Sequence, residues 1–408
     1  MSVIAQPLTQ NKSLRTGLRT LVEVSITGVC CVAFGLTVLF VLVTLITGKT
    51  AGTRDFVVYW ATGQQFAHHA NPYDSSAVLD IERHAGLPAR YGAMYMRNLP
   101  WTLPLTYPLA FFSVRTASLL WTLMLLACLG VSMRLLWWMH GRPRNRLHLL
   151  GFAFAPALLC IMFGQTSILA LLGLVLFLRL HAARPFMAGV SLWLCALKPH
   201  LFLPFAVVLL TWIVISRSYR ILAGAVVALA ASCAVVYLFD PMAWAQYAQM
   251  MRASGVAGSE FIPCLNLVLR LWLNPNALWL QYLPTTLACL WMLGYYWSRR
   301  TTWSWLEHGN LVMLVSVLAA PYAWPFDQVM VIPALLTGLY HIRSRNLLAA
   351  IALANACIEI AVYLEIRFPS AMYFWTLWAA PAWLAWYLLA DHFSAKTFPM
   401  YQEESFAH

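Results

Sequence analysis

The residues of this chain best suited to chemistry lie in the stretch TRDFVVYWATGQQFAHHANPYD, residues 53–74, directly after a long apolar run. Asp55 stands next to Arg54 and one helical turn before Tyr59. A carboxylate close to hydrocarbon is partly desolvated, which raises its proton affinity and suits it to act as a general base. An aspartate followed by FVVYWATGQQF is also a good helix N-cap, and the residue types alone favour the cap.

Three further segments combine polar side chains with breaks in apolar runs. The segment LKPH places Lys198 and His200 around Pro199 at the end of a run, with no obvious carboxylate partner for the lysine. Such a lysine either snorkels to water, which is the default, or binds an anion such as phosphate. The segments FGQTS and APYAWPFDQ supply Gln165 and Asp327, and each alone could be an ordinary turn.

Several common kinds of active site have no support in the sequence. We find no GxSxG, no HExxH, no phosphate-cradling glycine loop and no zinc-ligand spacing. The cysteines are scattered through apolar segments without CxxC spacing, as expected of packing residues. Asp55 also has no acidic neighbour in DxD spacing, so we expect neither a metal nor another cofactor.

The elements that must position these residues are membrane helices. The chain has 408 residues, of which 62% are hydrophobic and 10% charged. With a mean hydropathy of +0.71 it has more apolar surface than a soluble core could bury. The net charge of +12 comes largely from short arginine clusters between apolar runs, which are orientation signals rather than a nucleic-acid-binding stripe.

Placing the basic clusters on the cytoplasmic side gives an all-α bundle of about twelve transmembrane helices. The predicted runs are 24–47, 114–138, 147–163, 166–181, 186–198, 201–216, 221–239, 278–297, 305–320, 328–341, 346–364 and 371–391. Both tails, 1–23 and 392–408, are then cytoplasmic. Two long segments, 48–113 and 240–277, are extracytoplasmic, and the first contains amphipathic patterns typical of interfacial helices. We expect one domain over residues 1–408.

This threading brings many polar residues to the outer face: Asp55, Gln165, Lys198, His200, Asp240, Glu260, Asn266, Asp327 and Glu365. Polar groups that many helices place at one membrane boundary predict a water-accessible cavity that opens outward. The alternative is that connecting loops are simply polar, which would account for part of the set.

Read in order, these motifs resemble glycosyltransferase family 87, a bacterial group of the GT-C superfamily. RDFVVYWATGQQFAHHANPYD is similar to the family's opening signature. FGQTSILALLGL, MAGVSLWLCALKPHLFLPFAVVLL, IPCLNLVL and APYAWPFDQVMVIPAL then resemble later family segments in the family's order, over roughly residues 50–340. The family commonly has Asn where this chain has Ser167, a departure that leaves the substrate open.

The resemblance implies an inverting glycosyltransferase that moves a sugar, mannose in the best-known members, from a polyprenyl-phosphate donor to a lipid-linked or glycan acceptor. It implies a multi-pass protein of the bacterial plasma membrane whose site faces away from the cytoplasm. Asp55 matches the family's catalytic acid, which favours the general-base interpretation. We expect Lys198, His200 and Arg54 to bind the donor phosphate, and the other substrate-binding candidates are Tyr59, Gln165, Asn266, Tyr322 and Asp327. The alternative function is a transporter or flippase of lipid-linked glycans, which would need polar groups at both faces.

Overall fold

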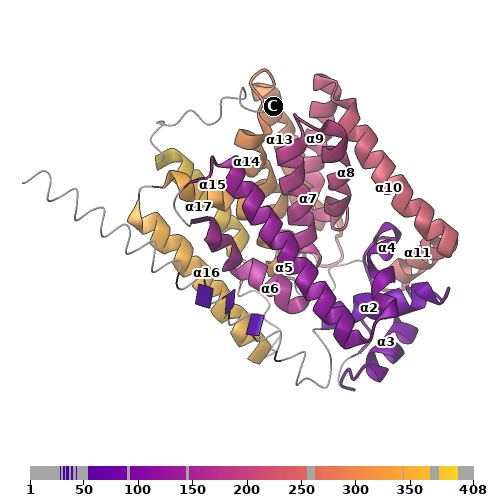
Figure 1. The fold of residues 1–408 in the computed structure, drawn as a ribbon. Helices are drawn as coiled ribbons and strands as arrows, with labels where there is room; N and C mark the ends of the chain where they lie inside the picture. The colour runs from indigo at the N-terminus through magenta and orange to yellow at the C-terminus, as the bar shows by residue number, and fades with distance from the viewer. Residues whose placement is uncertain are drawn as a thin grey trace, which may run out of the picture.

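The computed structural model describes residues 54–89, 92–143, 147–254, 262–342, 344–367 and 376–393, and single residues between 28 and 43. Within these residues all regular structure is helical (Figure 1). Most of the predicted first span, 24–47, lies outside the described residues, as do tail 1–23 and all but the first two residues of tail 392–408.

The helices are short and numerous, and η denotes a 3₁₀ helix. The first half contains α2 (Arg54–Ala67), α3 (Ser75–His84), η1 (Pro100–Thr102), α4 (Leu103–Thr106), η2 (Tyr107–Phe111), α5 (Val114–Met139), η3 (Leu147–Phe152), α6 (Ala155–Phe163), α7 (Ser167–Leu180) and α8 (Pro185–Cys195). The second half contains η4 (Pro199–Phe202), α9 (Leu203–Ser216), α10 (Tyr219–Phe239), α11 (Ala243–Ala253), α12 (Leu265–Leu273), α13 (Trp279–Arg299), α14 (Trp305–Leu318), η5 (Pro325–Val331), α15 (Ile332–His341), α16 (Arg345–Arg367) and α17 (Ala379–Phe393).

Four helical stretches in the described part are long and apolar enough to cross a membrane: Val114–Met139, Pro199–Ser216, Tyr219–Phe239 and Asn346–Leu364. The apolar helices α7 and α8 have only 14 and 11 residues. At about 1.5 Å per residue they are shorter than the roughly 30 Å of bilayer hydrocarbon. The prediction of a helical membrane protein is therefore confirmed, whereas the prediction of twelve full crossings is not.

Helices that end and restart at proline explain why the predicted apolar runs and the observed helices have different bounds. The predicted run 147–163 is divided into η3 and α6, and the run 328–341 into η5 and α15. Proline occupies the first turn of α6, of η5 and of α15. Proline lacks the amide hydrogen that a continuing helix needs, so it starts a new helix instead of extending the previous one.

Close helix packing uses glycine where side chains would collide. A Cβ atom at Gly189 in α8 would overlap the Ile221 carbonyl in α10, and one at Gly224 in α10 would overlap the Phe186 carbonyl in α8. Small residues that let backbones approach are typical of helix pairs in membranes, where packing rather than water exclusion drives association.

The two long segments predicted on the outer side meet at one end of the bundle. Figure 1 shows α2, α3, α4 and α11 gathered near the start of α5 and the end of α10. The Tyr73 ring contacts the Tyr247 ring of the second segment, with centroids 5.3 Å apart, and the Phe66 ring lies 5.6 Å from that of Phe239 at the end of α10. The described part of the segment 48–113 thus contains short helices, as the sequence predicts, packed on the helices that follow it.

Candidate active site

Helix α2 carries Asp55 and Tyr59 into the interior. The helix begins at Arg54, so Asp55 lies in its first turn and not at the cap position that the residue types favour. Asp55 is partly buried and is followed by three buried side chains of the same helix, those of Phe56, Val57 and Val58. The positive end of the helix dipole stabilises a carboxylate at this position.

Gln165 reaches the same place because the chain reverses sharply just before it. Gly164 ends α6 in the left-handed region, with φ 69° and ψ 30°, a conformation that costs glycine little and other residues more. The Trp121 indole donates to the Gly164 carbonyl at 2.7 Å. The Gln165 side chain is thereby held in a buried position at the junction of α6 and α7.

The Gln165 amide joins two parts of the predicted site. Its Nε2 donates to Asp55 Oδ2 at 2.8 Å, and its Oε1 accepts from Lys198 Nζ at 2.9 Å and from the Tyr59 hydroxyl at 3.1 Å. Burial raises the pKa of Tyr59, with the charge of Asp55 adding to the effect, so this hydroxyl stays protonated and able to donate. Two donors at Oε1 leave only one orientation for the amide, with its N–H groups toward Asp55.

Lys198 has a carboxylate partner, contrary to the expectation from sequence. Its Nζ lies 2.6 Å from Asp327 Oδ1, and the two side chains are 10% and 1% exposed. Asp327 Oδ1 also accepts from the Ser167 hydroxyl at 2.6 Å, and Oδ2 accepts from the Trp324 amide at 2.9 Å. Burial raises the pKa of Asp327, but the charge of Lys198 and the hydrogen bonds from Lys198 and Ser167 outweigh it and hold the pKa below its ordinary value. We call Asp55, Tyr59, Gln165, Lys198 and Asp327 the central cluster.

His200 and Tyr322 form a stacked pair close to this cluster. Their ring centroids are 3.9 Å apart, with an angle of 19° between the planes. Both side chains are partly buried, and the Nε2 atom of His200 has no hydrogen-bond partner among the described residues. The Lys198 ammonium lies 4.8 Å from the centre of the Phe326 ring, a cation–π contact.

Asn266 lies apart from the central cluster. It is fully buried, and its Nδ2 donates to the carbonyls of Gln281 and Ala319 and to the Thr285 hydroxyl at 2.9–3.0 Å. Gln281 Nε2 donates to the Pro321 carbonyl at 2.9 Å. These two amides therefore hold the backbone just before Tyr322 and do not point into the central cluster.

The second aspartate of the opening stretch is a helix cap. Asp74 precedes α3, and its Oδ1 accepts from the backbone amides of Ser76 and Ala77 at 3.0 and 3.2 Å. The Ser76 hydroxyl, with the Ala77 amide, holds the pKa of Asp74 below its ordinary value. Three candidates from the sequence cannot be placed, because the side chains of Arg54 and Glu365, and all of Glu260, lie outside the described residues.

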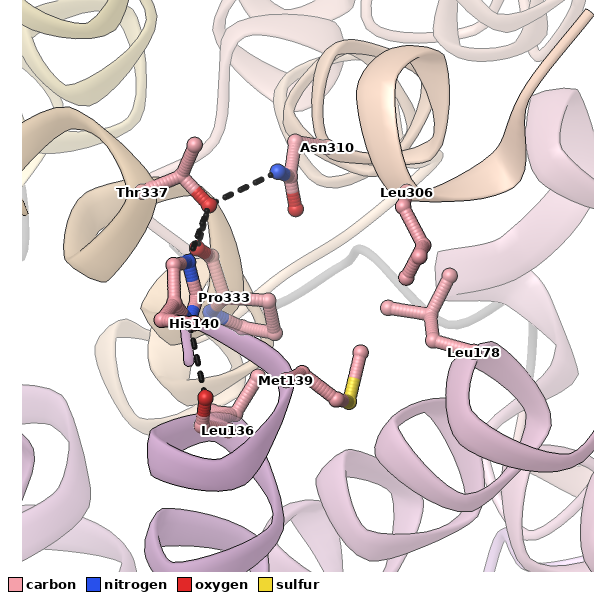
Figure 2. A pocket seen from close by; sticks show the side chains of 8 residues that line it. All are labelled: Leu136, Met139, His140, Leu178, Leu306, Asn310, Pro333 and Thr337. Atoms are coloured by element: carbon pink, nitrogen blue, oxygen red, sulfur yellow. Dashed lines mark hydrogen bonds between the residues drawn. The ribbon is translucent and has the colours of Figure 1, made fainter. Parts of the chain in front are cut away.

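A small cavity lies at the other end of α5 (Figure 2). Its volume is about 20 Å³, room for one water molecule. Figure 2 shows His140, Asn310 and Thr337 on its polar side, where Thr337 Oγ1 lies 3.1 Å from His140 Nε2 and 3.0 Å from Asn310 Nδ2. Helix α5 separates this cavity from the central cluster, so the cavity in Figure 2 is not the predicted outward-opening one. The outward-opening cavity stays a prediction.

Reasoning from sequence missed the supporting roles of two residues: Ser167, which it singled out only as a departure from the family, and Trp121. Ser167 binds Asp327, and Trp121 binds the carbonyl of Gly164. Ser167 stands two residues after Gln165, so its position was a usable signal, whereas no local pattern marks Trp121. Among the described residues no three metal-ligating side chains lie together, and the expectation of a metal-free enzyme stays a prediction.

Comparison with known proteins agrees with the resemblance that the motifs show. The family model described as glycosyltransferase family 87 matches residues 98–321, more than half of the chain. No curated protein and no solved structure matches the chain. The matched range contains Gln165 and Lys198 and ends six residues before Asp327. This membrane protein belongs to glycosyltransferase family 87.

Proposed function

We propose that the protein transfers a sugar from a polyprenyl-phosphate donor to a lipid-linked or glycan acceptor, with inversion at the anomeric carbon. The observation that carries the proposal is the Gln165 amide, which links Asp55 to the ion pair of Lys198 and Asp327. A carboxylate and an ammonium group joined through one amide are the parts needed to activate a hydroxyl and to stabilise an anionic leaving group.

Asp55 is the proposed general base. The carboxylate accepts the proton of the acceptor hydroxyl while that oxygen attacks the anomeric carbon, and the bond between this carbon and the phosphate oxygen breaks. The phosphate leaves with the electron pair, and a single displacement of this kind inverts the configuration. Gln165 holds Asp55 Oδ2 through its N–H, which fixes the carboxylate in one orientation and favours its ionised form.

We propose that Lys198, His200 and Arg54 act on the phosphate side of the site. Two of the three N–H donors of Lys198 are bonded to Gln165 and Asp327, which leaves one for a phosphate oxygen. His200 and Tyr322 offer a stacked aromatic face beside it. Asp327, Tyr59 and Gln165 orient the catalytic groups, and Asn266 positions the Tyr322 segment rather than contacting the sugar.

The remaining features follow the family resemblance. We propose a bacterial plasma membrane protein whose site faces the periplasm or cell exterior, with mannose as the first sugar to test. Helices α2, α3 and α4 of the segment 48–113 and helix α11 of the segment 240–277 lie at one end of the bundle, which supports a single functional face. Family membership favours an enzyme over the alternative, a transporter or flippase of lipid-linked glycans.

A panel of labelled polyprenyl-phosphate sugars incubated with the purified protein and a membrane lipid extract tests this proposal. We expect one donor to be consumed by the wild-type protein and none by Asp55→Asn, which keeps the size of the side chain but cannot accept the proton. Asp74→Asn is the matched control, because it alters the second aspartate of the same stretch and should retain transfer. Transfer by Asp55→Asn at the wild-type rate, or movement of intact lipid-linked sugars across vesicles without any transfer, would reject the proposal.

A further inference from the structure

Helix α12 has its polar residues inside and large apolar residues outside. Asn266 and Arg270 lie one helical turn apart and are 0% and 4% exposed. Leu265, Trp272 and Leu273 are spaced as a single stripe of the helix and are exposed, Trp272 by 79%. A helix on a water-covered surface has the opposite arrangement, because water solvates polar side chains and not leucine or tryptophan. The surroundings that fit the outer side of α12 are therefore apolar.

Hydrogen bonds to α13 satisfy the polar residues of α12 that are buried. Asn266 Nδ2 donates to the Gln281 carbonyl at 2.9 Å and to the Thr285 hydroxyl at 3.0 Å. Arg270 Nη1 donates to Gln281 Oε1 at 2.7 Å. Polar side chains at membrane depth are normally turned inward and bonded in this way. Since Gln281 and Thr285 belong to the first two turns of α13, α12 lies alongside that end of α13.

Helix α13 has the length and the end residues of a membrane crossing. It has 21 residues, which at 1.5 Å each make about 31 Å, close to the roughly 30 Å of bilayer hydrocarbon. An exposed tryptophan stands near each end, Trp279 and Trp297, as in the aromatic belts of membrane proteins. At the second end the Arg300 guanidinium lies 4.5 Å from the centre of the Trp297 ring. Thr285, which bonds to α12, is about 9 Å along the helix from Trp279, so α12 extends below the first belt.

The turn between α12 and α13 has the composition of a membrane boundary. Asn274 and Asn276 are exposed, and the Asn276 amide donates to Asn274 Oδ1 at 3.0 Å. The exposed side chains on both sides of this turn are large and apolar: Leu273 before it, and Leu278 and Trp279 after it. Polar residues at the tip with tryptophan beside them are expected where a pair of helices passes from hydrocarbon to the headgroups.

The inner side of α12 reaches the aromatic residues beside the central cluster. Leu267 belongs to a small buried apolar group against which Tyr322 and Trp324 pack. Tyr322 stacks on His200 with ring centroids 3.9 Å apart, and the Trp324 amide donates to Asp327 Oδ2 at 2.9 Å. One layer of aromatic residues therefore connects α12 to the central cluster.

We propose that α12 is embedded in the bilayer and that the partner of Leu265, Trp272 and Leu273 is the hydrocarbon of lipid acyl chains. The inference goes beyond the proposed function and does not depend on it. It moves residues 265–273 from the aqueous part of the segment 240–277 into the membrane, beside the first turns of α13. Helix α12 and the Tyr322 ring are then the lipid-facing wall of the central cluster, and a lipid-linked molecule that approaches this wall does so from within the bilayer.

Photolabelling of the full chain in phosphatidylcholine vesicles tests the inference. One probe is a phosphatidylcholine with a diazirine on its acyl chain, the other a water-soluble diazirine, and mass spectrometry of peptides locates the labels. We expect the lipid probe to label α12 as strongly as Val226 and Val227, exposed residues in the middle of α10, and the water-soluble probe to leave it unlabelled. Asp80 and Arg83, exposed on α3, are the controls that water should reach.

A matched pair of cysteine variants gives a second measurement. Leu273→Cys and Asn276→Cys lie three residues apart, and their reaction with a charged maleimide is followed on the peptide that contains them. We expect Leu273→Cys to react at least about 10-fold more slowly, because a thiol in hydrocarbon rarely ionises. Labelling of α12 from water, or equal reactivity of the two cysteines, overturns the inference. Labelling by neither probe also overturns it, because another part of the chain or a second copy then covers α12.

Discussion

Replacing the buried ion pair of Lys198 and Asp327 tests the central cluster as a unit. The two groups lie 2.6 Å apart and are 10% and 1% exposed. Removing either partner leaves the other charge buried without compensation, which typically costs about 3–5 kcal/mol. We therefore expect Lys198→Met and Asp327→Asn each to lower the free energy of unfolding by roughly that amount.

The double variant should be more stable than either single variant. Asn at position 327 has one oxygen acceptor, so it keeps only one of the hydrogen bonds from Ser167 and Trp324, and Lys198→Met removes the one to Gln165. Apart from the ion pair, the double change therefore loses about two hydrogen bonds, roughly 2 kcal/mol. The coupling between the two positions is then more than about 3 kcal/mol. Hydrogen-bonded side-chain pairs within membranes average only about 0.6 kcal/mol, so the expected value is well separated from an ordinary contact.

Reversible unfolding in mixed detergent and SDS micelles, followed by tryptophan fluorescence, measures this cycle. Asp80→Asn and Arg83→Met, two exposed residues of α3, form the control cycle and should add within about 0.5 kcal/mol. Sugar transfer should stay absent in the stabilised double variant, because Gln165 has lost the donor that orients it. A coupling near 0.6 kcal/mol, or transfer at the wild-type rate in the double variant, would refute the reasoning.

Two further predictions concern single side chains. Gln165→Glu places a second carboxylate where the amide now lies 2.8 Å from Asp55, so the two carboxyl groups share a proton and the pKa of the base rises. The acid limb of the pH profile of kcat/KM should therefore move to higher pH. An unchanged acid limb would contradict the assignment of Asp55 as the base. Asp74→Ala removes the cap of α3 and should cost about 1 kcal/mol of unfolding free energy while transfer persists. Loss of transfer in a folded Asp74→Ala protein would show that this aspartate does more than cap a helix.

Local pattern was sufficient for the parts of the site that lie within one segment. The motif around Asp55, the break at Gln165 and the lysine of LKPH were all visible as polar residues at the ends of apolar runs, and the structure brings the three together. The match to the family model covers the segments of Gln165 and Lys198 but not the motif around Asp55. What the pattern could not supply was the distance between them.

The partners of these residues were hidden because they are far away in the chain. Lys198 and Asp327 are 129 residues apart, and no periodicity connects them, so the lysine seemed to have no carboxylate partner. Asn266 lies at the start of a helix, as several residues of the central cluster do. Only its hydrogen bonds to three acceptors in the protein interior show that its role is structural. Apolar runs also overstated the number of crossings, because a run of hydrophobic residues continues through proline breaks at which the helix stops.

The order in which the ribosome makes these segments has a consequence for insertion. Asp55 is made first, Gln165 and Lys198 follow, and Asp327 is completed only after four-fifths of the 408 residues. Until then the ammonium group of Lys198, whose side chain ends up 10% exposed, lacks the carboxylate with which it pairs. A nascent chain stalled before α14 must keep that group at the water boundary, so final burial of the lysine and completion of the central cluster are the same late event.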